Sequence, residues 1–346
     1  MRIAVDVMGG DYGSRVVIVG VRRALAADGQ IEKLWLVGNQ AEIENGCRHA
    51  NLRDPRVEIV HASEMLTMKD RPAEVRTRKD SSMVRALELV RDNKADAVIS
   101  PGNTGALVAG SLRLRRLDGI ERPALAARMP SKTRDFVLLD AGANPVCEPL
   151  HLAQFAVMGS IYSREVLGRD KPRVGILSNG SEDSKGNELT KGAVKLCASL
   201  DLNFMGYVEG FELFKDGVDV AIADGFTGNI VLKTAESLGY AMMQMLRREL
   251  TATPVRKLGA QLSRGAFLSL KQRIDPEVYG GAALLGFNGI VIKAHGSARE
   301  NAIMNAIRLA TDEIRHNVNQ LIVREIARAN ARMGSSGAHA AKTAKA

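Results

Sequence analysis

Residues 95–110, ADAVISPGNTGALVAG, contain the pattern that decides the fold class. The apolar run that ends at Ser100 predicts a buried strand, and the turn at residues 101–105 leads into a helix-forming stretch. A strand, a glycine turn and a helix in this order are typical of α/β proteins, in which ligands bind beyond the carboxyl ends of the strands. The turn has two interpretations. Either Asn103 or Thr104 caps the helix, or the bare glycine backbone lets an anion approach the helix N-terminus.

The same alternation continues along the chain. Further strand-like runs are RIAVDVM (residues 2–8), LWLVG (34–38), VEIVHA (57–62), FVLLDAGAN (136–144), RVGILSNG (173–180), VDVAIADGFTGN (218–229) and GIVIKAHGSA (289–298). Helix-forming stretches follow most of these runs. The alternation predicts a mainly parallel, doubly wound sheet covered by helices, in one large domain over residues 1–332.

Residues 240–275 interrupt the alternation and predict a helical hairpin that turns near Thr253 and Pro254. The hairpin mixes apolar with basic residues: Met243, Leu246, Leu258, Leu262, Phe267 and Leu270, with Arg247, Arg248, Arg256, Lys257, Arg264, Lys271 and Arg273. Such a hairpin suits an anionic membrane surface, a protein partner or packing within a dimer. Residues 333–346 are small, polar and basic, and predict a disordered tail.

The composition narrows the range of functions. The chain has 346 residues, 45% of them hydrophobic, which indicates a globular protein. Its formal charge of +9 suits either solubility alone or an acidic partner. That partner is nucleic acid, an anionic membrane, an acidic protein or a phosphorylated molecule, and an aromatic content of 4% argues against nucleic acid read by stacking. Cys47, Cys147 and Cys197 have no CxxC spacing, and the sequence shows neither a signal peptide nor a long apolar run, so we expect a reduced, cytoplasmic protein.

Polar groups gather in the predicted turns at the strand ends. Besides residues 102–105, the turns contain Asp140 and Asn144; Asn179, Gly180 and Lys185; Asp224, Gly228 and Asn229; and Lys293, His295 and Ser297. Taken alone, each turn contains only residue types that are common in turns. Because the carboxyl ends of parallel strands meet at one edge of a sheet, we expect the five turns to converge on one polar, phosphate-sized site.

Familiar nucleotide and metal motifs do not occur in this sequence. It lacks GxxxxGK[ST], GxGxxG and HExxH, and its His and Cys residues have no metal-ligand spacing. Asp6, Asp11, Asp140 and Asp224 suit a magnesium ion by residue type, but they suit the orienting of turns equally well. We therefore expect neither a metal nor a cofactor.

In their order, these turns closely resemble those of the PlsX family, the phosphate acyltransferases of bacterial lipid synthesis. The matching stretches are residues 6–11 (DVMGGD), 79–83 (KDSSM), 102–106 (GNTGA), 139–144 (LDAGAN), 154–159 (QFAVMG), 185–188 (KGNE), 224–229 (DGFTGN), 279–282 (YGGA) and 293–297 (KAHGS). Together they span about residues 1–310. Two stretches depart from the family pattern: residues 12–14 (YGS) stand where His-Ala-Pro is usual, and residues 177–186 (LSNGSEDSKG) lack the usual Asn-x-Gly-Glu-Glu before Lys-Gly.

The resemblance implies a fold, an activity and partners. The fold is a three-layer α/β/α arrangement, isopropylmalate dehydrogenase-like or Rossmann-like, in a cytoplasmic homodimer, with peripheral membrane association in some members. The activity is acyl transfer, in which a long-chain fatty acyl group moves from acyl carrier protein to inorganic phosphate. The acyl phosphate product feeds the acylation of glycerol 3-phosphate in phospholipid synthesis, so a downstream glycerol-3-phosphate acyltransferase is a further candidate partner.

The residues suit this chemistry. Phosphate is anionic near pH 7 and needs no serine or cysteine nucleophile, so the site must supply positioning and charge stabilisation. We expect His295, Lys185 and Lys293 to offset the phosphate charge, stabilise the oxyanion or protonate the leaving thiolate, and the alternative is a structural role in their loops. We expect phosphate or substrate to be bound by Asp6, Gly9, Gly10, Asp11, Ser81, Gly102, Asn103, Thr104, Gly105, Asp140, Asn144, Asn179, Gly180, Asp224, Gly228, Asn229 and Ser297.

Basic residues are dense between residues 113 and 134, and acyl carrier proteins are acidic. We therefore expect Arg113, Arg115 and Arg116 to contact the carrier, with the 240–275 hairpin as the competing surface. Three other functions stay open: a phosphate acetyltransferase-like enzyme that uses acyl-CoA, an isopropylmalate dehydrogenase-like enzyme, and a non-catalytic basic scaffold for membrane or nucleic acid. A preference for acyl-CoA over acyl carrier protein would indicate the first of these, and a requirement for nicotinamide and metal would indicate the second. Salt-dependent DNA binding without turnover would indicate the third.

Overall fold

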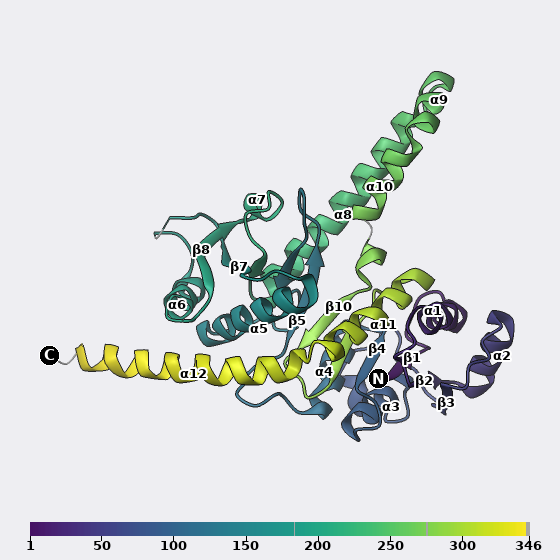
Figure 1. Cartoon of the computed structure of the whole chain (residues 1–346), viewed down its shortest axis with the longest axis horizontal. Coiled ribbons are helices and arrows are strands. Elements are labelled where there is room, and N and C mark those ends of the chain that lie inside the picture. The colour runs from purple at the N-terminus through teal and green to yellow at the C-terminus, as the bar shows by residue number, and fades with distance from the viewer. Residues whose placement is uncertain (183, 275, 344–346) are drawn as a thin grey trace.

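The structure is a computed structural model that describes residues 1–182, 184–274 and 276–343 (Figure 1). Its strands are β1 (Arg2–Asp6), β2 (Lys33–Gly38), β3 (Val57–His61), β4 (Ala97–Ser100), β5 (Ala124–Met129), β6 (Phe136–Leu139), β7 (Arg173–Ser178), β8 (Asn203–Glu209), β9 (Val220–Ile222), β10 (Ala282–Leu285) and β11 (Ile290–Lys293). Its α-helices are α1 (Ser14–Ala27), α2 (Gln40–Ala50), α3 (Ser82–Arg91), α4 (Thr104–Ser111), α5 (Pro149–Leu167), α6 (Glu188–Cys197), α7 (Gly210–Leu213), α8 (Gly225–Leu250), α9 (Pro254–Leu262), α10 (Arg264–Ile274), α11 (Glu300–Arg315) and α12 (Val318–Thr343). Short 3-10 helices are η1 (Pro72–Arg76), η2 (Leu112–Leu114) and η3 (Pro276–Tyr279).

The described strands form one 11-stranded sheet in the order β3-β2-β1-β4-β11-β10-β5-β6-β9-β7-β8. Strands β3, β2, β1, β4 and β11 are parallel to one another, and so are β6, β9, β7 and β8. Between these halves, β10 pairs antiparallel with β11 and with β5, and β5 pairs antiparallel with β6. The predicted mainly parallel α/β sheet is confirmed, but its two parallel halves run in opposite directions.

This reversal decides where the polar turns lie. The turns after β1, β4 and β11 lie at one edge of the sheet, which we name the first edge. The turns after β6, β7 and β9 lie at the opposite edge, which we name the second edge. The expectation that all five turns follow strands ending at one edge is therefore wrong, because the antiparallel strands β10 and β5 reverse the strand direction between the halves.

Two apolar cores fill the space on the two faces of the sheet. One face is covered by α1, α2, α5, α6, α11 and α12, which bury residues such as Ile18, Phe155 and Ile303 completely. The other face is covered by α3, α4 and the first turns of α8, with Leu87 and Leu107 in its core. Figure 1 shows the resulting three layers, with the sheet between two layers of helices.

Helices α8, α9 and α10 form the predicted hairpin, which projects from the body (Figure 1). Its turn lies at residues 251–253, where the Thr253 side chain accepts a hydrogen bond from the Arg256 backbone and Pro254 opens α9. The returning limb is divided into α9 and α10. Among the described residues, no helix combines the length and the apolar character needed to span a membrane.

The C-terminal segment differs from the sequence prediction. Helix α12 reaches Thr343, so residues 333–343 of the expected disordered tail are helical, and residues 344–346 lie outside the described residues. The segment contains several alanines and no proline, and extending an existing helix requires no new nucleation.

Candidate functional site

Three turns meet at the first edge of the sheet. The Asp11 backbone N–H donates to the Gly296 carbonyl over 2.8 Å, which joins the turn after β1 to the turn after β11. A side-chain carbon at Gly9 would lie 2.7 Å from the backbone of Gly102, so the turns after β1 and β4 are in direct contact. We name these three turns the first cluster.

Asp6 lies beneath the first cluster, and 1% of it is exposed. Its Oδ2 accepts a hydrogen bond from Ser100 Oγ (2.6 Å), and its Oδ1 accepts one from the Met8 backbone (3.2 Å). Ser100 Oγ in turn accepts from the Gly102 N–H (3.1 Å). Burial raises the pKa of Asp6, while the hydrogen bond from Ser100 works against this rise. Both carboxylate oxygens accept hydrogen bonds from the protein, so Asp6 orients two turns and does not face solvent.

The N-terminus of α4 supports both interpretations of the PGNTG turn. Asn103 Oδ1 accepts from the Ala106 backbone (3.0 Å), and Nδ2 donates to the Met68 carbonyl (3.2 Å), so this side chain caps the helix and anchors a neighbouring segment. The N–H groups of Thr104 and Gly105 stand in the first turn of the helix, where backbone donors have no partner inside it. Anion binding by these donors stays a prediction.

Lys293 ends β11 with a buried amine, and 8% of the residue is exposed. Its Nζ donates to the carbonyls of Ala294 and, over 3.5 Å, Pro101. Burial lowers the pKa of Lys293 to about 8. The amine is therefore mostly protonated at pH 7 and loses its charge just above neutrality.

Helix α8 brings a further cation to the first cluster. Burial is the main cause of the lowered pKa of Lys293 and of His295, and the charge of Lys233 lowers both further, while the charge of Glu236 acts in the opposite direction. Lys233 Nζ pairs with Glu236 over 2.7 Å. An anion bound among the three bases would relieve their mutual repulsion. No sequence pattern marks Lys233, because its helix begins at the second edge and only the fold shows that the helix returns to the first.

His295 has an exposed ring, and its Nδ1 lies 2.8 Å from Ser297 Oγ. The Ser297 backbone N–H donates to the same nitrogen over 3.3 Å. Nδ1 is therefore an acceptor, and the neutral ring carries its proton on Nε2. Partial burial, together with the positive charge of Lys233, lowers the pKa of His295. The ring is therefore neutral at pH 7 and offers Nε2–H as a donor.

Asp140 and Asn144 form a second, separate arrangement at the second edge. Asp140 is fully buried, and its Oδ1 accepts from the backbones of Leu125 (2.9 Å), Gly142 (3.0 Å) and Ala143 (2.9 Å). Its Oδ2 accepts from the backbone (2.7 Å) and the side chain (2.8 Å) of Asn144. These bonds occupy both oxygens, so the Asp140 carboxylate shapes its own turn.

The N-terminus of α8 packs against this turn. Asp224 caps the helix, with Oδ1 accepting from the Thr227 N–H (2.9 Å) and Oδ2 from its hydroxyl (2.8 Å). A side-chain carbon at Gly228 would lie 1.9 Å from the Asp140 carbonyl oxygen, and Asn229 lies against the same turn. These residues therefore join α8 to β6.

The turn after β7 also lies at the second edge. Asn179 Oδ1 accepts from the Gly186 N–H (3.0 Å), and the Lys185 stem packs over Gly180. Within the described residues, no hydrogen bond or ion pair joins this turn to the first cluster. The structure thus brings together Lys293 and His295 and sets Lys185 at the opposite edge.

Gly10, Ser81 and Cys147 lie in three different surroundings. Gly10 packs against Pro101 in the first cluster. Ser81 is buried at the start of α3, and its hydroxyl has no hydrogen-bond partner in the described structure. Burial raises the pKa of Cys147 to about 12, which makes this thiol a poor nucleophile.

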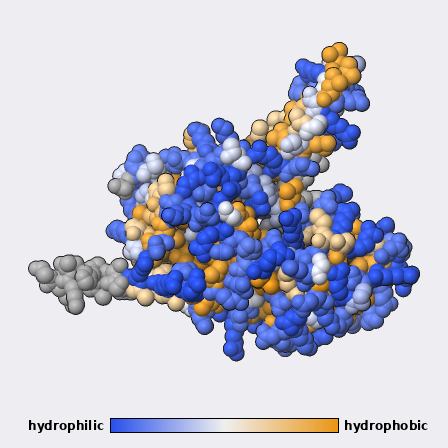
Figure 2. Space-filling view, viewed as in Figure 1, coloured by the Kyte–Doolittle hydropathy of each residue, from blue (hydrophilic) through white to orange (hydrophobic). Residues whose placement is uncertain are grey.

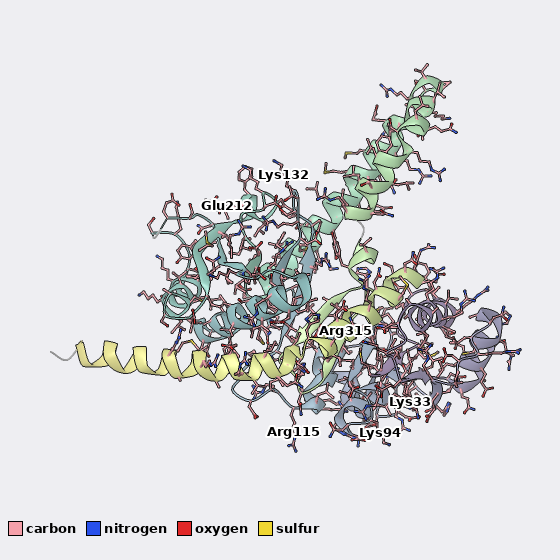
Figure 3. The ribbon with its side chains drawn as sticks, viewed as in Figure 1. Lys33, Lys94, Arg115, Lys132, Glu212 and Arg315 are labelled. Carbon is pink, nitrogen blue, oxygen red and sulfur yellow. The ribbon has the colours of Figure 1, made fainter. Side chains whose placement is uncertain are left out.

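Metal ligands and cavities do not coincide with the predicted residues. Across residues 1–182, 184–274 and 276–343, no three His, Cys, Asp or Glu residues are grouped to hold a metal ion. A groove of about 490 Å³ lies beside Arg315, and another of about 600 Å³ is lined by Lys33 and Lys94 (Figure 3). Neither groove is lined by a predicted site residue.

The three predicted carrier contacts do not share one edge of the sheet. The Arg115 carbonyl accepts from the Asn288 N–H (3.0 Å), and Arg116 forms a β-bridge with Phe287. Both partners belong to the turn that precedes β11, whereas Lys293 ends this strand. Arg113 instead donates to the Val75 carbonyl (3.1 Å), in the segment that packs beside α4, and Arg115 projects outward from the body in Figure 3. Arg115 and Arg116 therefore lie at the second edge, and Arg113 does not lie with them.

Comparison with known proteins gives relatives over nearly the whole chain. The sequence pattern of a family described as "Fatty acid synthesis protein" matches residues 1–321. A phosphate acyltransferase from Akkermansia muciniphila is 44% identical over 336 residues, which cover 95% of this chain and 96% of that protein. Phosphate acyltransferases from Bacillus pumilus and Bacillus subtilis are 45% and 44% identical, each over 94% of this chain and 98% of its own length.

Solved structures share the fold at much lower identity. A phosphotransacetylase from Streptococcus pyogenes superposes with a TM-score of 0.62 at 17% identity, over 90% of this chain and 93% of its own. A phosphotransacetylase from Staphylococcus aureus gives a TM-score of 0.56 at 16% identity, over 90% of this chain and 94% of its own. These likenesses confirm the α/β architecture.

Proposed function

Because the chain belongs to the family of fatty acid synthesis proteins, we propose that it is a phosphate acyltransferase of phospholipid synthesis. It moves a long-chain fatty acyl group from acyl carrier protein to inorganic phosphate and releases acyl phosphate. The observation that supports this proposal most directly is the first cluster, where Lys293 contacts the Pro101 carbonyl beside the N-terminus of α4 and the charge of Lys233 acts on both Lys293 and His295. Three bases and free backbone donors suit a phosphate anion.

The chemistry follows from this arrangement. The N–H groups of Thr104 and Gly105 and the Lys293 ammonium hold phosphate, whose deprotonated oxygen attacks the thioester carbonyl. A carbon–oxygen bond forms, and the carbonyl oxygen takes up the negative charge, which the Nε2–H of His295 stabilises. The carbon–sulfur bond then breaks, and the thiolate leaves with a proton from Lys293 or from water.

The second edge has a structural role in this proposal. Asp140 and Asn144 hold the turn after β6, and Asp224 caps α8, so together they fix the helix that carries Lys233 to the first cluster. Lys185 stands outside the catalytic group. His295→Ala is therefore expected to lower kcat about 10²-fold or more, and Lys185→Ala is expected to leave kcat within about threefold.

We further propose that the protein acts in the cytoplasm as a homodimer and contacts the inner membrane surface through the hairpin tip. The tip exposes Val255, Leu258 and Leu262 by 80%, 61% and 82%. Arg256 and Lys257 lie exposed between these apolar residues. Figure 2 shows apolar surface at the end of the hairpin, flanked by hydrophilic surface. An apolar stripe beside basic side chains suits an anionic lipid surface.

The test of the acyltransferase activity measures thiol release from long-chain acyl carrier protein with and without inorganic phosphate. Hydroxylamine traps the acyl phosphate in parallel. Phosphate-dependent release with trapped product is the expected result. Turnover of acyl-CoA without turnover of the acyl carrier protein would favour an acetyltransferase-like enzyme, and absence of both would contradict the proposal. Equal loss of kcat in Lys185→Ala and His295→Ala would return Lys185 to the catalytic group.

A further inference from the structure

Residues 67–79 lie directly against the first cluster. Asn103 donates to the Met68 carbonyl (3.2 Å) at one end of this segment. The Met68 side chain packs on Gly296, where an added side-chain carbon would lie 2.3 Å from the methionine methyl group. Pro72 packs on Gly105 in the same way, since a side-chain carbon added at Gly105 would lie 2.7 Å from the proline ring. The segment therefore touches the turns after both β4 and β11.

This segment presents a basic surface. It contains five basic and two acidic residues, and Arg78 binds both acids, Asp70 over 3.3 Å and Glu74 over 2.9 Å. The four remaining bases are exposed, and we name them the basic rim: Lys69, Arg71, Arg76 and Lys79. Within the described residues, none of the four forms an ion pair. Their charges are therefore available to a partner.

The fold holds the basic rim in place. Leu66 and Val75 are buried in the core, with exposures of 2% and 0%, and they anchor the segment at two points. The carboxylate of the neighbouring Asp80 is bound to Ser63 and not to the basic rim. It accepts hydrogen bonds from the Ser63 backbone (2.9 Å) and hydroxyl (2.6 Å). A surface of fixed shape and one charge sign can orient a partner as it approaches.

We propose that the basic rim, and not the surface that carries Arg115 and Arg116, is the surface on which the acidic acyl carrier protein docks. This inference rests on the proposed function, because the carrier must deliver its thioester to phosphate at the first cluster. The basic rim borders that cluster, whereas Arg115 lies at the opposite edge of the sheet. Met65 and Met68, each 43% exposed, add apolar surface for the acyl arm beside the site.

The test compares charge reversal at the two surfaces. One variant carries Arg76→Glu and Lys79→Glu, and its matched control carries Arg115→Glu and Arg116→Glu. At low salt, the first pair is expected to raise KM for acyl carrier protein about tenfold or more, with the effect shrinking as salt is added. In both variants, KM for phosphate is expected to stay within about twofold of its value in the unmodified protein. In the control, KM for the carrier is expected to stay within the same range. Should the reversal pair not fold, Arg76→Gln with Lys79→Gln is expected to raise that KM about threefold.

Three outcomes would overturn the inference. An unchanged KM for the carrier in the folded rim variant would overturn it alone, with the proposed function intact. A raised KM in the Arg115 and Arg116 pair without one in the rim variant would return docking to the second edge. Absence of phosphate-dependent thiol release by the unmodified protein would overturn the proposed function and, with it, this assignment.

Discussion

Asp6 and Ser100 are two buried side chains that hold the backbone of the proposed phosphate site in shape. Asp6 holds the turn after β1 directly and the turn after β4 through the Ser100 hydroxyl. The sequence predicts Asp6 as a ligand because acidic residues in glycine turns suit substrate or metal binding. Its burial shows that it instead fixes the shape of the backbone donors. Ser100 was missed because a serine at the end of an apolar strand gives no signal.

Ser100→Ala is expected to raise KM for phosphate about fivefold or more and to leave KM for the acyl donor within about twofold. The substitution leaves Gly102 N–H and one Asp6 oxygen short of a partner, which costs about 1–3 kcal/mol of folding free energy. Steady-state kinetics and thermal unfolding measure the two effects. Ser163→Ala is the matched control, since the Ser163 hydroxyl is also buried but has no hydrogen-bond partner in the described chain. Equal rises of both KM values would contradict the positioning role.

Lys293 sets a testable limit on activity at alkaline pH. Its pKa of about 8 lies below the usual lysine value because burial disfavours the charged amine. The protonated form offsets phosphate charge, so kcat/KM is expected to fall as pH rises through about 8. Lys293→Arg keeps the charge at all these pH values and is expected to abolish that fall, even if its rate at pH 7 is lower. A wild-type profile that stays flat from pH 7 to 9.5 would rule out a protonated Lys293 in the free enzyme.

Helix α8 is the element that connects the two edges of the sheet. It starts against the Asp140 turn, packs along β5 and β6, and carries Lys233 toward Lys293 before it continues into the hairpin. The close approach at its start requires glycine, because a side-chain carbon at Gly228 would overlap the Asp140 carbonyl. Sequence patterns predict a helix after the DGFTGN turn, but the pattern contains no information about which strand that turn contacts.

Gly228→Ala is expected to destabilise the protein by about 1–3 kcal/mol, since the added methyl group forces α8 away from β6. Gly259→Ala is the matched control: it lies in α9 with open space around it, and alanine favours the helix, so a gain of up to about 1 kcal/mol is expected. Chemical unfolding monitored by circular dichroism gives both free energies. An undiminished stability in Gly228→Ala would show that the joint between α8 and the Asp140 turn is looser than the structure indicates.

At the scale of the molecule, the sequence predicts most strands, the turns and the helical hairpin, but it misses β5 and β10 and with them the reversal of strand direction in the sheet. Apolar periodicity and glycine turns are local, and they suffice to place Asp6, Gly102 and Lys293 at strand ends. Direction depends on which strands pair, and β10 pairs with β5 across a long stretch of sequence. No local pattern records that pairing, so the sequence groups Asp140 and Lys185 with Lys293, and the structure separates them.

The proposed membrane contact of the hairpin concerns the whole molecule. Leu258→Asp with Leu262→Asp is expected to reduce sedimentation with vesicles rich in anionic lipid about tenfold or more, because inserting each leucine contributes about 1.5–3 kcal/mol. Val146→Asp is the matched control, since Val146 is 84% exposed and lies outside the hairpin. Thiol release from acyl carrier protein without vesicles should persist in both variants, because the tip lies outside the first cluster. If vesicle binding persists and light scattering instead shows a smaller assembly, the exposed leucines pack against a second copy of the chain, and the hairpin serves the dimer rather than the membrane.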